Sequence, residues 1–227
     1  MTLFGLVRHG QTDYNLRSLF QGSSDIPLNE TGIAQAHSAL DDLPAVDWDV
    51  VVSSPLQRAE QTARIIGEDH AIPFGGTEER LREIDWGEAE GQPTAEMQER
   101  YPTRDFPGVE DAQQVADRGF DGLEALERRY PGRKVLVVAH GTLIRFLLSG
   151  IMERPLPSIP NATLSLIELE GTTWSVSMIA GQQVAHRVTM DSRAQNPRLF
   201  VEKGELTPLD LRPAQGTDPA DAEEAAR

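Results

Sequence analysis

The chain has 227 residues, with 21 Lys or Arg against 36 Asp or Glu, so its formal net charge at pH 7 is −15. This acidity argues against a nucleic-acid partner, whose binding depends on cationic side chains, and the absence of cysteine excludes disulfides and cysteine nucleophiles. No apolar run approaches the roughly 18–20 residues of a membrane helix, and no signal peptide is apparent, so we expect a cytoplasmic protein without a membrane partner.

Strand-like and helix-like segments alternate along the first 180 residues. Short apolar runs predict strands at residues 3–7, 49–53, 78–81, 134–139, 163–170 and 174–179. Periodic apolar residues, with Thr31 and Pro55 at helix starts, predict helices at 31–42, 55–68, 112–130 and 142–152. The alternation predicts one α/β domain over residues 1–180, with a mostly parallel sheet covered by helices on both faces. Residues 181–227 turn polar and end in TDPADAEEAAR, which predicts a C-terminal extension with a weakly ordered acidic end.

Two of the predicted strands end in a histidine followed by a glycine. Arg8-His9-Gly10 follows the first strand, and His140-Gly141 follows the strand at 134–139. Arg58 comes shortly after the strand at 49–53, in SSPLQRAEQT. Ligands of parallel sheets bind beyond the carboxyl ends of the strands, so we expect these side chains to meet at that edge.

Arginines and histidines gathered in this way suit a phosphoryl group. Guanidinium groups match the oxygens of a phosphate, and a neutral imidazole can attack phosphorus. Arg8 beside His9 favours an anion over a metal ion, so no metal is expected. The departing oxygen needs a proton donor, and the loop LREIDWGEAEG offers Glu83, Asp85 and Glu88, which spacing alone does not distinguish.

Four separated motifs resemble those of the histidine phosphatase superfamily, which includes the cofactor-dependent phosphoglycerate mutases. They are RHGQT with Asn15, SSPLQRAEQTA, LREIDWGEAEG and VVAHGTLIR, in the family's order. The resemblance implies a three-layer α/β/α sandwich in which His9 becomes phosphorylated and Glu83 donates the proton. It also implies that Arg8, Asn15, Arg58 and His140 hold the phosphoryl group, and that no metal or other cofactor is needed.

The family contains both phosphatases and mutases, and this chain is more similar to the phosphatases. The interval between Glu88 and Lys134 is short, whereas mutases typically carry a longer insertion there. Gln11 stands where mutases usually have an acidic residue. We therefore expect a phosphomonoester hydrolase. The alternatives are a phosphoglycerate mutase, which would use 2,3-bisphosphoglycerate, and a non-catalytic binding protein on the same fold, disfavoured because the full set of motif residues is present.

The substrate is expected to be a small phosphorylated metabolite. Residues that could line the mouth of the pocket include Gln21, Gln57 and Trp86, together with Tyr14, Phe20, Met97, Tyr101 and Phe106. The loop from Glu88 to Asp111 contains only two cations, Arg100 and Arg104, which favours a substrate whose remaining part is not strongly anionic. A homodimer is possible, with the C-terminal extension as one contributor.

Overall fold

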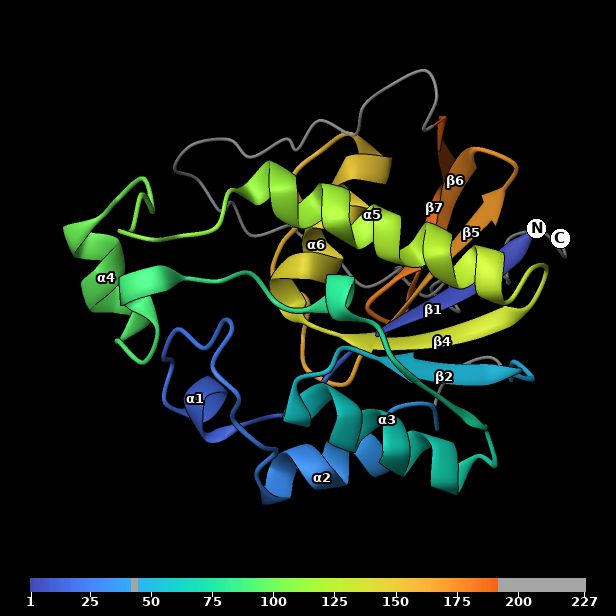
Figure 1. Cartoon of the computed structure of the whole chain (residues 1–227), viewed down its shortest axis with the longest axis horizontal. Helices are drawn as coiled ribbons and strands as arrows, with labels where there is room; N and C mark the ends of the chain where they lie inside the picture. The colour runs from blue at the N-terminus through green and yellow to red at the C-terminus, as the bar shows by residue number, and fades with distance from the viewer. Residues whose placement is uncertain (42–44, 192–227) are drawn as a thin grey trace, which may run out of the picture.

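The computed structural model describes residues 1–41 and 45–191, in which a seven-stranded sheet lies between two layers of helices (Figure 1). The strands are β1 (Thr2–Arg8), β2 (Val50–Ser53), β3 (Phe74–Thr77), β4 (Lys134–Ala139), β5 (Leu164–Glu170), β6 (Thr173–Ile179) and β7 (Gln182–Asp191). Their order in the sheet is β3-β2-β4-β1-β5-β6-β7. The first four in this order are parallel, and β5, β6 and β7 each pair antiparallel to the strand before, so β6 shares the direction of β1. The predicted α/β class with a mostly parallel sheet is confirmed.

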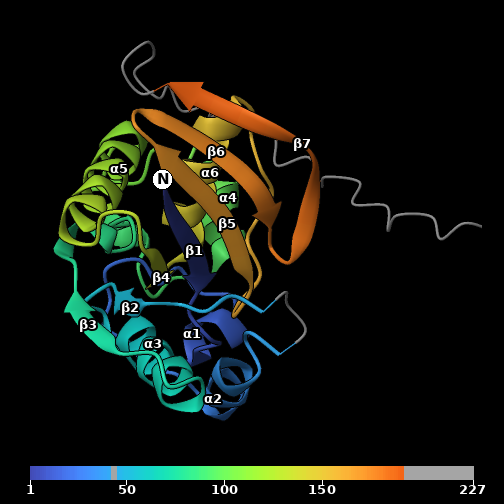
Figure 2. The same cartoon turned by 90° about the vertical axis from the view of Figure 1, so that its right-hand side faces the viewer.

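Helices cover both faces of this sheet. They are α1 (Asp13–Leu16), α2 (Glu30–His37), α3 (Gln57–Asp69), α4 (Thr94–Arg100), α5 (Ala112–Arg129) and α6 (Gly141–Met152). α2 and α3 lie on one face, and α5 and α6 lie on the other (Figures 1 and 2). Within the described ranges, no helix combines the length and apolar character that crossing a bilayer requires.

The apolar run of β4 is explained by burial on both faces of the sheet. Val135 and Val137 pack into the core below α5 and α6, whereas Leu136 and Val138 pack into the core on the α3 side. All four side chains have no exposed surface. Because alternate residues face opposite layers that are both apolar, the strand shows no polar alternation.

The predicted strand at 78–81 is wrong, and the edge strand lies just before it. β3 is Phe74–Thr77, and Glu79–Leu81 forms a 3₁₀ turn that buries Leu81. The sequence of β3, FGGT, was not predicted as a strand because glycines weaken the pattern of apolar residues that marks one. Gly75 is needed there because a Cβ at this position would come within 2.6 Å of the Tyr130 hydroxyl.

Four further elements differ from the sequence prediction. α2 begins at Glu30 because the Asn29 side chain, not Thr31, caps it by accepting from the Gly32 amide at 2.9 Å. The short helices α1 and α4 were not predicted. β7 occupies residues 182–191 of the predicted extension, and Met190 at its end is buried in the core. The rest of that extension, 192–227, lies outside the described residues.

Candidate active site

The register of the sheet brings three strand ends to one edge. Arg8 pairs with Ala139 across β1 and β4, and Ser53 pairs with Val138 across β2 and β4. The residues that directly follow these strands therefore lie at the same carboxyl edge. They are His9 after β1, Ser54 after β2 and His140 after β4. The backbone amide of His9 still donates to the Ala139 carbonyl at 3.0 Å, which ties the two strand ends together.

His9 is buried and its ring is held in one orientation. Its side chain is 2% exposed, and its Nδ1 lies 2.7 Å from the Gly10 carbonyl. A carbonyl can only accept, so Nδ1 carries the hydrogen and Nε2 carries the lone pair. Nε2 accepts from Arg58 Nε at 3.2 Å. Burial, followed by the charges of Arg58 and Arg8, holds the pKa of His9 well below its ordinary value, so the imidazole is neutral near pH 7.

Arg58 projects from the first turn of α3 and is fully buried. Its two terminal nitrogens donate at 2.7 Å each to the carbonyls of Ser24 and Gly22. Burial lowers its pKa to about 10, which still leaves it charged at neutral pH. Its rigid hydrogen bonding fixes the direction from which a cation faces His9.

Arg8 reaches the pocket from the end of β1 with part of its guanidinium uncommitted. One terminal nitrogen donates to the Ile159 carbonyl at 2.5 Å, whereas Nε has no hydrogen-bond partner among the described residues. A Cβ on Gly141 would come within 3.0 Å of that Nε. The glycine after His140 therefore leaves room for Arg8 against the start of α6.

Glu83 is distinguished from the other carboxylates of its loop by its place in the pocket. Its Oε2 accepts from the Thr142 amide at 2.9 Å and its Oε1 from the Leu143 amide at 3.0 Å, so it caps the N-terminus of α6. Asp85 and Glu88 are exposed and do not line the pocket. The alternatives left open by spacing are thus reduced to Glu83.

Arg118 of α5 holds the Glu83 loop, a role that the sequence did not indicate. Its guanidinium donates to the carbonyls of Arg80, Arg82 and Glu83 at 2.9, 2.6 and 3.1 Å. It also pairs with Glu110 at 2.8 Å. In the sequence, Arg118 is one of several charges on an amphipathic helix, and nothing in its spacing separates it from solvent-facing neighbours.

His140 lies behind His9 and does not line the pocket. Its side chain has no exposed surface, and the two imidazole rings meet edge to face with centroids 5.2 Å apart. Nε2 lies 2.7 Å from the Ser54 hydroxyl, while Nδ1 has no partner among the described residues. Burial and the charge of Arg58 hold the pKa of His140 well below its ordinary value.

Asn15 lines the pocket as predicted, and Asn161 supports it. Asn15 Oδ1 accepts from the Thr12 amide at 3.2 Å and from Asn161 Nδ2 at 3.3 Å. Asn161 Nδ2 also donates to the His9 carbonyl at 2.9 Å. Asn161 belongs to the loop before β5 and was missed, because no motif marks it.

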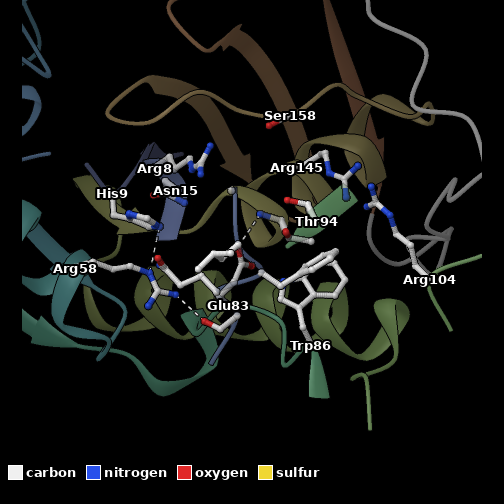
Figure 3. A pocket seen from close by; sticks show the side chains of 16 residues that line it. Arg8, His9, Asn15, Arg58, Glu83, Trp86, Thr94, Arg104, Arg145 and Ser158 are labelled. Carbon is white, nitrogen blue, oxygen red and sulfur yellow. Dashed lines mark hydrogen bonds between the residues drawn. The ribbon is translucent and has the colours of Figure 1, made fainter. Parts of the chain in front are cut away.

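These groups surround a pocket of about 260 Å³ (Figure 3). Its lining residues are Arg8, His9, Asn15, Leu19, Phe20, Gln21, Gly22, Arg58, Glu83, Trp86, Thr94, Arg104, Gly141, Thr142, Arg145 and Ser158. Gln21 and Trp86 are therefore placed as predicted. Gln57 is not, because its exposed side chain donates to Asp25 at 3.0 Å, outside the pocket. Arg145 was not among the predicted residues.

Most of the other residues predicted to line the pocket pack behind it instead. Phe106 and Met97 are buried in a small core with Phe20, of which only Phe20 also lines the pocket. Tyr101 packs against Phe106 with ring centroids 5.7 Å apart. This cluster anchors the segment between α4 and α5 over one side of the site.

Known proteins match this chain over the whole region that forms the pocket. The profile of the histidine phosphatase superfamily (branch 1) matches residues 4–181. The uncharacterized phosphatase PhoE of Bacillus subtilis (strain 168) is 41% identical over 180 residues, which cover 78% of this chain and 93% of PhoE. The probable phosphoglycerate mutase GpmB of Yersinia pestis (strain Pestoides F) is 30% identical over 188 residues, which cover 76% of this chain and 87% of GpmB. A mycobacterial glucosyl-3-phosphoglycerate phosphatase, solved in complex with VO3, superposes with a TM-score of 0.70 at 29% identity, covering 79% of this chain and 99% of that one.

Proposed function

Because the chain belongs to the histidine phosphatase superfamily, we propose that it is a phosphomonoesterase that works through a phosphohistidine at His9. One observation carries this proposal: a buried neutral imidazole presents its Nε2 lone pair beside Arg58, in a pocket that also contains Arg8 and Glu83. The pocket volume of about 260 Å³ fits a small phosphorylated metabolite.

In the first step, Arg58 Nε turns its hydrogen bond from His9 to the bound phosphoryl group, and the freed Nε2 lone pair attacks the phosphorus of the monoester. The N–P bond forms as the bond from phosphorus to the ester oxygen breaks, and Glu83 gives its proton to the departing alcohol. Arg8 and Arg58 stabilise the charge on the equatorial oxygens, and Asn15 can donate to them through its amide nitrogen. Glu83 Oε1 accepts from the amides of Leu143 and Ile84, whereas Oε2 accepts from the Thr142 amide alone and keeps a second lone pair that can carry the proton.

In the second step, water attacks the phosphohistidine. Glu83, now ionised, takes a proton from the water as the new P–O bond forms and the N–P bond breaks. Inorganic phosphate leaves and His9 returns to its neutral form, so protons and charges balance over the cycle. These steps draw only on groups of the chain, with no metal and no organic cofactor.

His140 contributes from behind the pocket. Its neutral ring packs against His9, and its Nδ1, which has no partner among the described residues, is the atom that would serve the transferred phosphoryl oxygens. Its bond to Ser54 connects this ring to the end of β2.

Hydrolysis is supported over phosphoryl transfer between substrate positions by the identities of the relatives. The relative named a phosphatase is 41% identical, and the one named a mutase is 30% identical. The mycobacterial protein of similar structure is also a phosphatase. We therefore propose that water, and not a hydroxyl group of a substrate, accepts the phosphoryl group.

Phosphorus NMR of the enzyme with 3-phosphoglycerate and, separately, with nitrophenyl phosphate tests this proposal. We expect steady release of inorganic phosphate from a substrate, no net conversion to 2-phosphoglycerate, and loss of turnover in His9→Ala. His70→Ala is the matched control, because His70 is exposed and is not among the residues that line the pocket. Interconversion of phosphoglycerates with little free phosphate would establish a mutase, and hydrolysis that survives His9→Ala would refute the mechanism.

A further inference from the structure

Two arginines lie together in the pocket on the side away from His9. Arg145 projects from α6 and Arg104 from the segment between α4 and α5, and both line the pocket. Figure 3 shows their guanidinium groups facing each other, with Glu83 and Trp86 between them and the group formed by Arg8, His9 and Arg58. The pocket thus holds two separate pairs of cations.

Neither arginine of this second pair forms an ion pair with an acidic side chain of the described residues. Both side chains are half-buried, and none of the ion pairs or side-chain hydrogen bonds of the described residues involves either guanidinium. Burial lowers the pKa of each, and the charge of Arg104 lowers the pKa of Arg145 further, whereas the charge of Glu83 raises it and only partly offsets these effects. Half-buried like charges that repel each other are unfavourable unless an anion joins them.

The backbone around Arg104 is built to present it. Its φ of 59° lies in the left-handed region, which is uncommon for a residue other than glycine. The Arg104 amide donates to the Tyr101 carbonyl at 2.9 Å, and Phe106, 2% exposed, anchors the chain two residues later. A strained residue between two anchored aromatic residues points to a function for its side chain.

We propose that Arg104 and Arg145 bind a second anionic group on the substrate, a carboxylate or a second phosphate, while Arg8 and Arg58 hold the phosphoryl group that is transferred. This deepens the proposed phosphatase function and rests on it. It departs from the expectation of a substrate with little further charge, which came from the composition of one loop. That loop, Glu88 to Asp111, does not contain Arg145, which belongs to α6 and lies beside Arg104 in the pocket of the folded chain.

Matched substrate pairs test the proposal on the full chain. Glycerol 3-phosphate and 3-phosphoglycerate differ in one carboxylate, as do phenyl phosphate and 4-carboxyphenyl phosphate over a longer span. Fructose 6-phosphate and fructose 1,6-bisphosphate differ in a second phosphate. In at least one pair, we expect kcat/KM to be about tenfold or more higher for the member with the second anionic group, since hydrogen bonds to charged groups discriminate strongly. The pair that shows the preference distinguishes a carboxylate from a phosphate.

Charge-removing variants locate that preference. Arg104→Gln and Arg145→Gln should each lower kcat/KM about tenfold more for the member that carries the second anionic group than for the member that lacks it. We expect this loss mainly in KM. Arg100→Gln removes the same charge from an exposed position of α4 outside the pocket, and should leave the ratio unchanged. Arg145→Lys keeps the charge and should keep part of the preference, which provides a second reading if a glutamine variant folds poorly.

The result that overturns the proposal is distinct from the one that overturns the phosphatase mechanism. Equal kcat/KM for both members of every pair in the unmodified chain would refute the second anion site, as would equal losses for both members in the glutamine variants. Either result leaves His9-dependent hydrolysis intact. Turnover of any of these substrates by His9→Ala would instead refute the mechanism.

Discussion

Glu83→Gln separates two roles of one side chain, the proton donation that we propose and the capping of α6 that the structure shows. The carboxylate accepts from the amides of Thr142 and Leu143 at 2.9 and 3.0 Å. Glutamine keeps one acceptor oxygen and turns an NH2 group toward the other amide. Bonds to charged acceptors contribute about 1.5–3 kcal/mol each and neutral ones about half as much, so losing one bond and weakening the other should lower the stability by about 2–4 kcal/mol. For a chain of this size that corresponds to a Tm decrease of roughly 4–16 °C.

The catalytic effect of the same change should depend on the leaving group. Removing a general acid typically lowers the rate of the assisted step by about 10²–10⁴-fold. An alkyl alcohol needs the proton, whereas nitrophenolate departs as a stable anion. We therefore expect the rate of phosphohistidine formation, measured by rapid quench, to fall about 10²-fold or more with an alkyl phosphate. With nitrophenyl phosphate, the stopped-flow burst should slow by less than about tenfold, while steady turnover falls because water activation is also lost.

Asp85→Asn is the matched control for this experiment. Asp85 lies two residues from Glu83 and is exposed, and its side chain accepts from the nearby Gly87 amide at 2.7 Å. It should leave both rates within about twofold of the unmodified chain. If Glu83→Gln slowed the nitrophenyl burst as much as the alkyl reaction, Glu83 would act by holding α6 and the pocket in place, and another group would have to supply the proton.

Two further predictions concern stability. The pKa values of His9 and His140 are depressed in the folded chain, so between their ordinary value of 6.5 and their lowered values the unfolded chain binds more protons. Stability should therefore fall as pH decreases from about 6.5 to 5, by up to about 1.4 kcal/mol per pH unit for each histidine. Denaturant titrations should show this slope, and His140→Gln should reduce it; an unchanged slope would mean that His140 is not held neutral. Gly32→Ala in α2 should destabilise despite better helix propensity, since its Cβ would lie 2.0 Å from the Gln11 carbonyl oxygen. Overpacking of about 1–3 kcal/mol exceeds the propensity gain of about 1 kcal/mol, and a raised Tm would contradict this estimate.

The sequence was sufficient for the parts of this protein that are local in the chain. A fully buried parallel strand is a continuous apolar run, so β1, β2 and β4 are visible as such, and so are the residues that follow their ends. The convergence of Arg8, His9, Arg58 and His140 follows from the rule that parallel strands end at one edge. The predicted family is confirmed by the profile match over residues 4–181. The glycine-rich strand β3 and the strand β7 were not predicted, because residue propensity and composition are weak guides at the edges of a sheet.

Contacts between distant segments were decided only by the tertiary structure. The choice of Glu83 over Asp85 depends on the start of α6, about sixty residues later in the chain, whose first amides donate to the Glu83 carboxylate, whereas the Asp85 carboxylate accepts from the Gly87 amide. Arg118 and Asn161 support the site through backbone carbonyls, and a carbonyl acceptor leaves no mark in the sequence. Arg104 and Arg145, 41 positions apart, become neighbours because the α4–α5 segment and α6 line the same pocket. Residue type and local pattern determined the chemistry of phosphoryl transfer; the placement of charges around the rest of the substrate is a property of the packed chain.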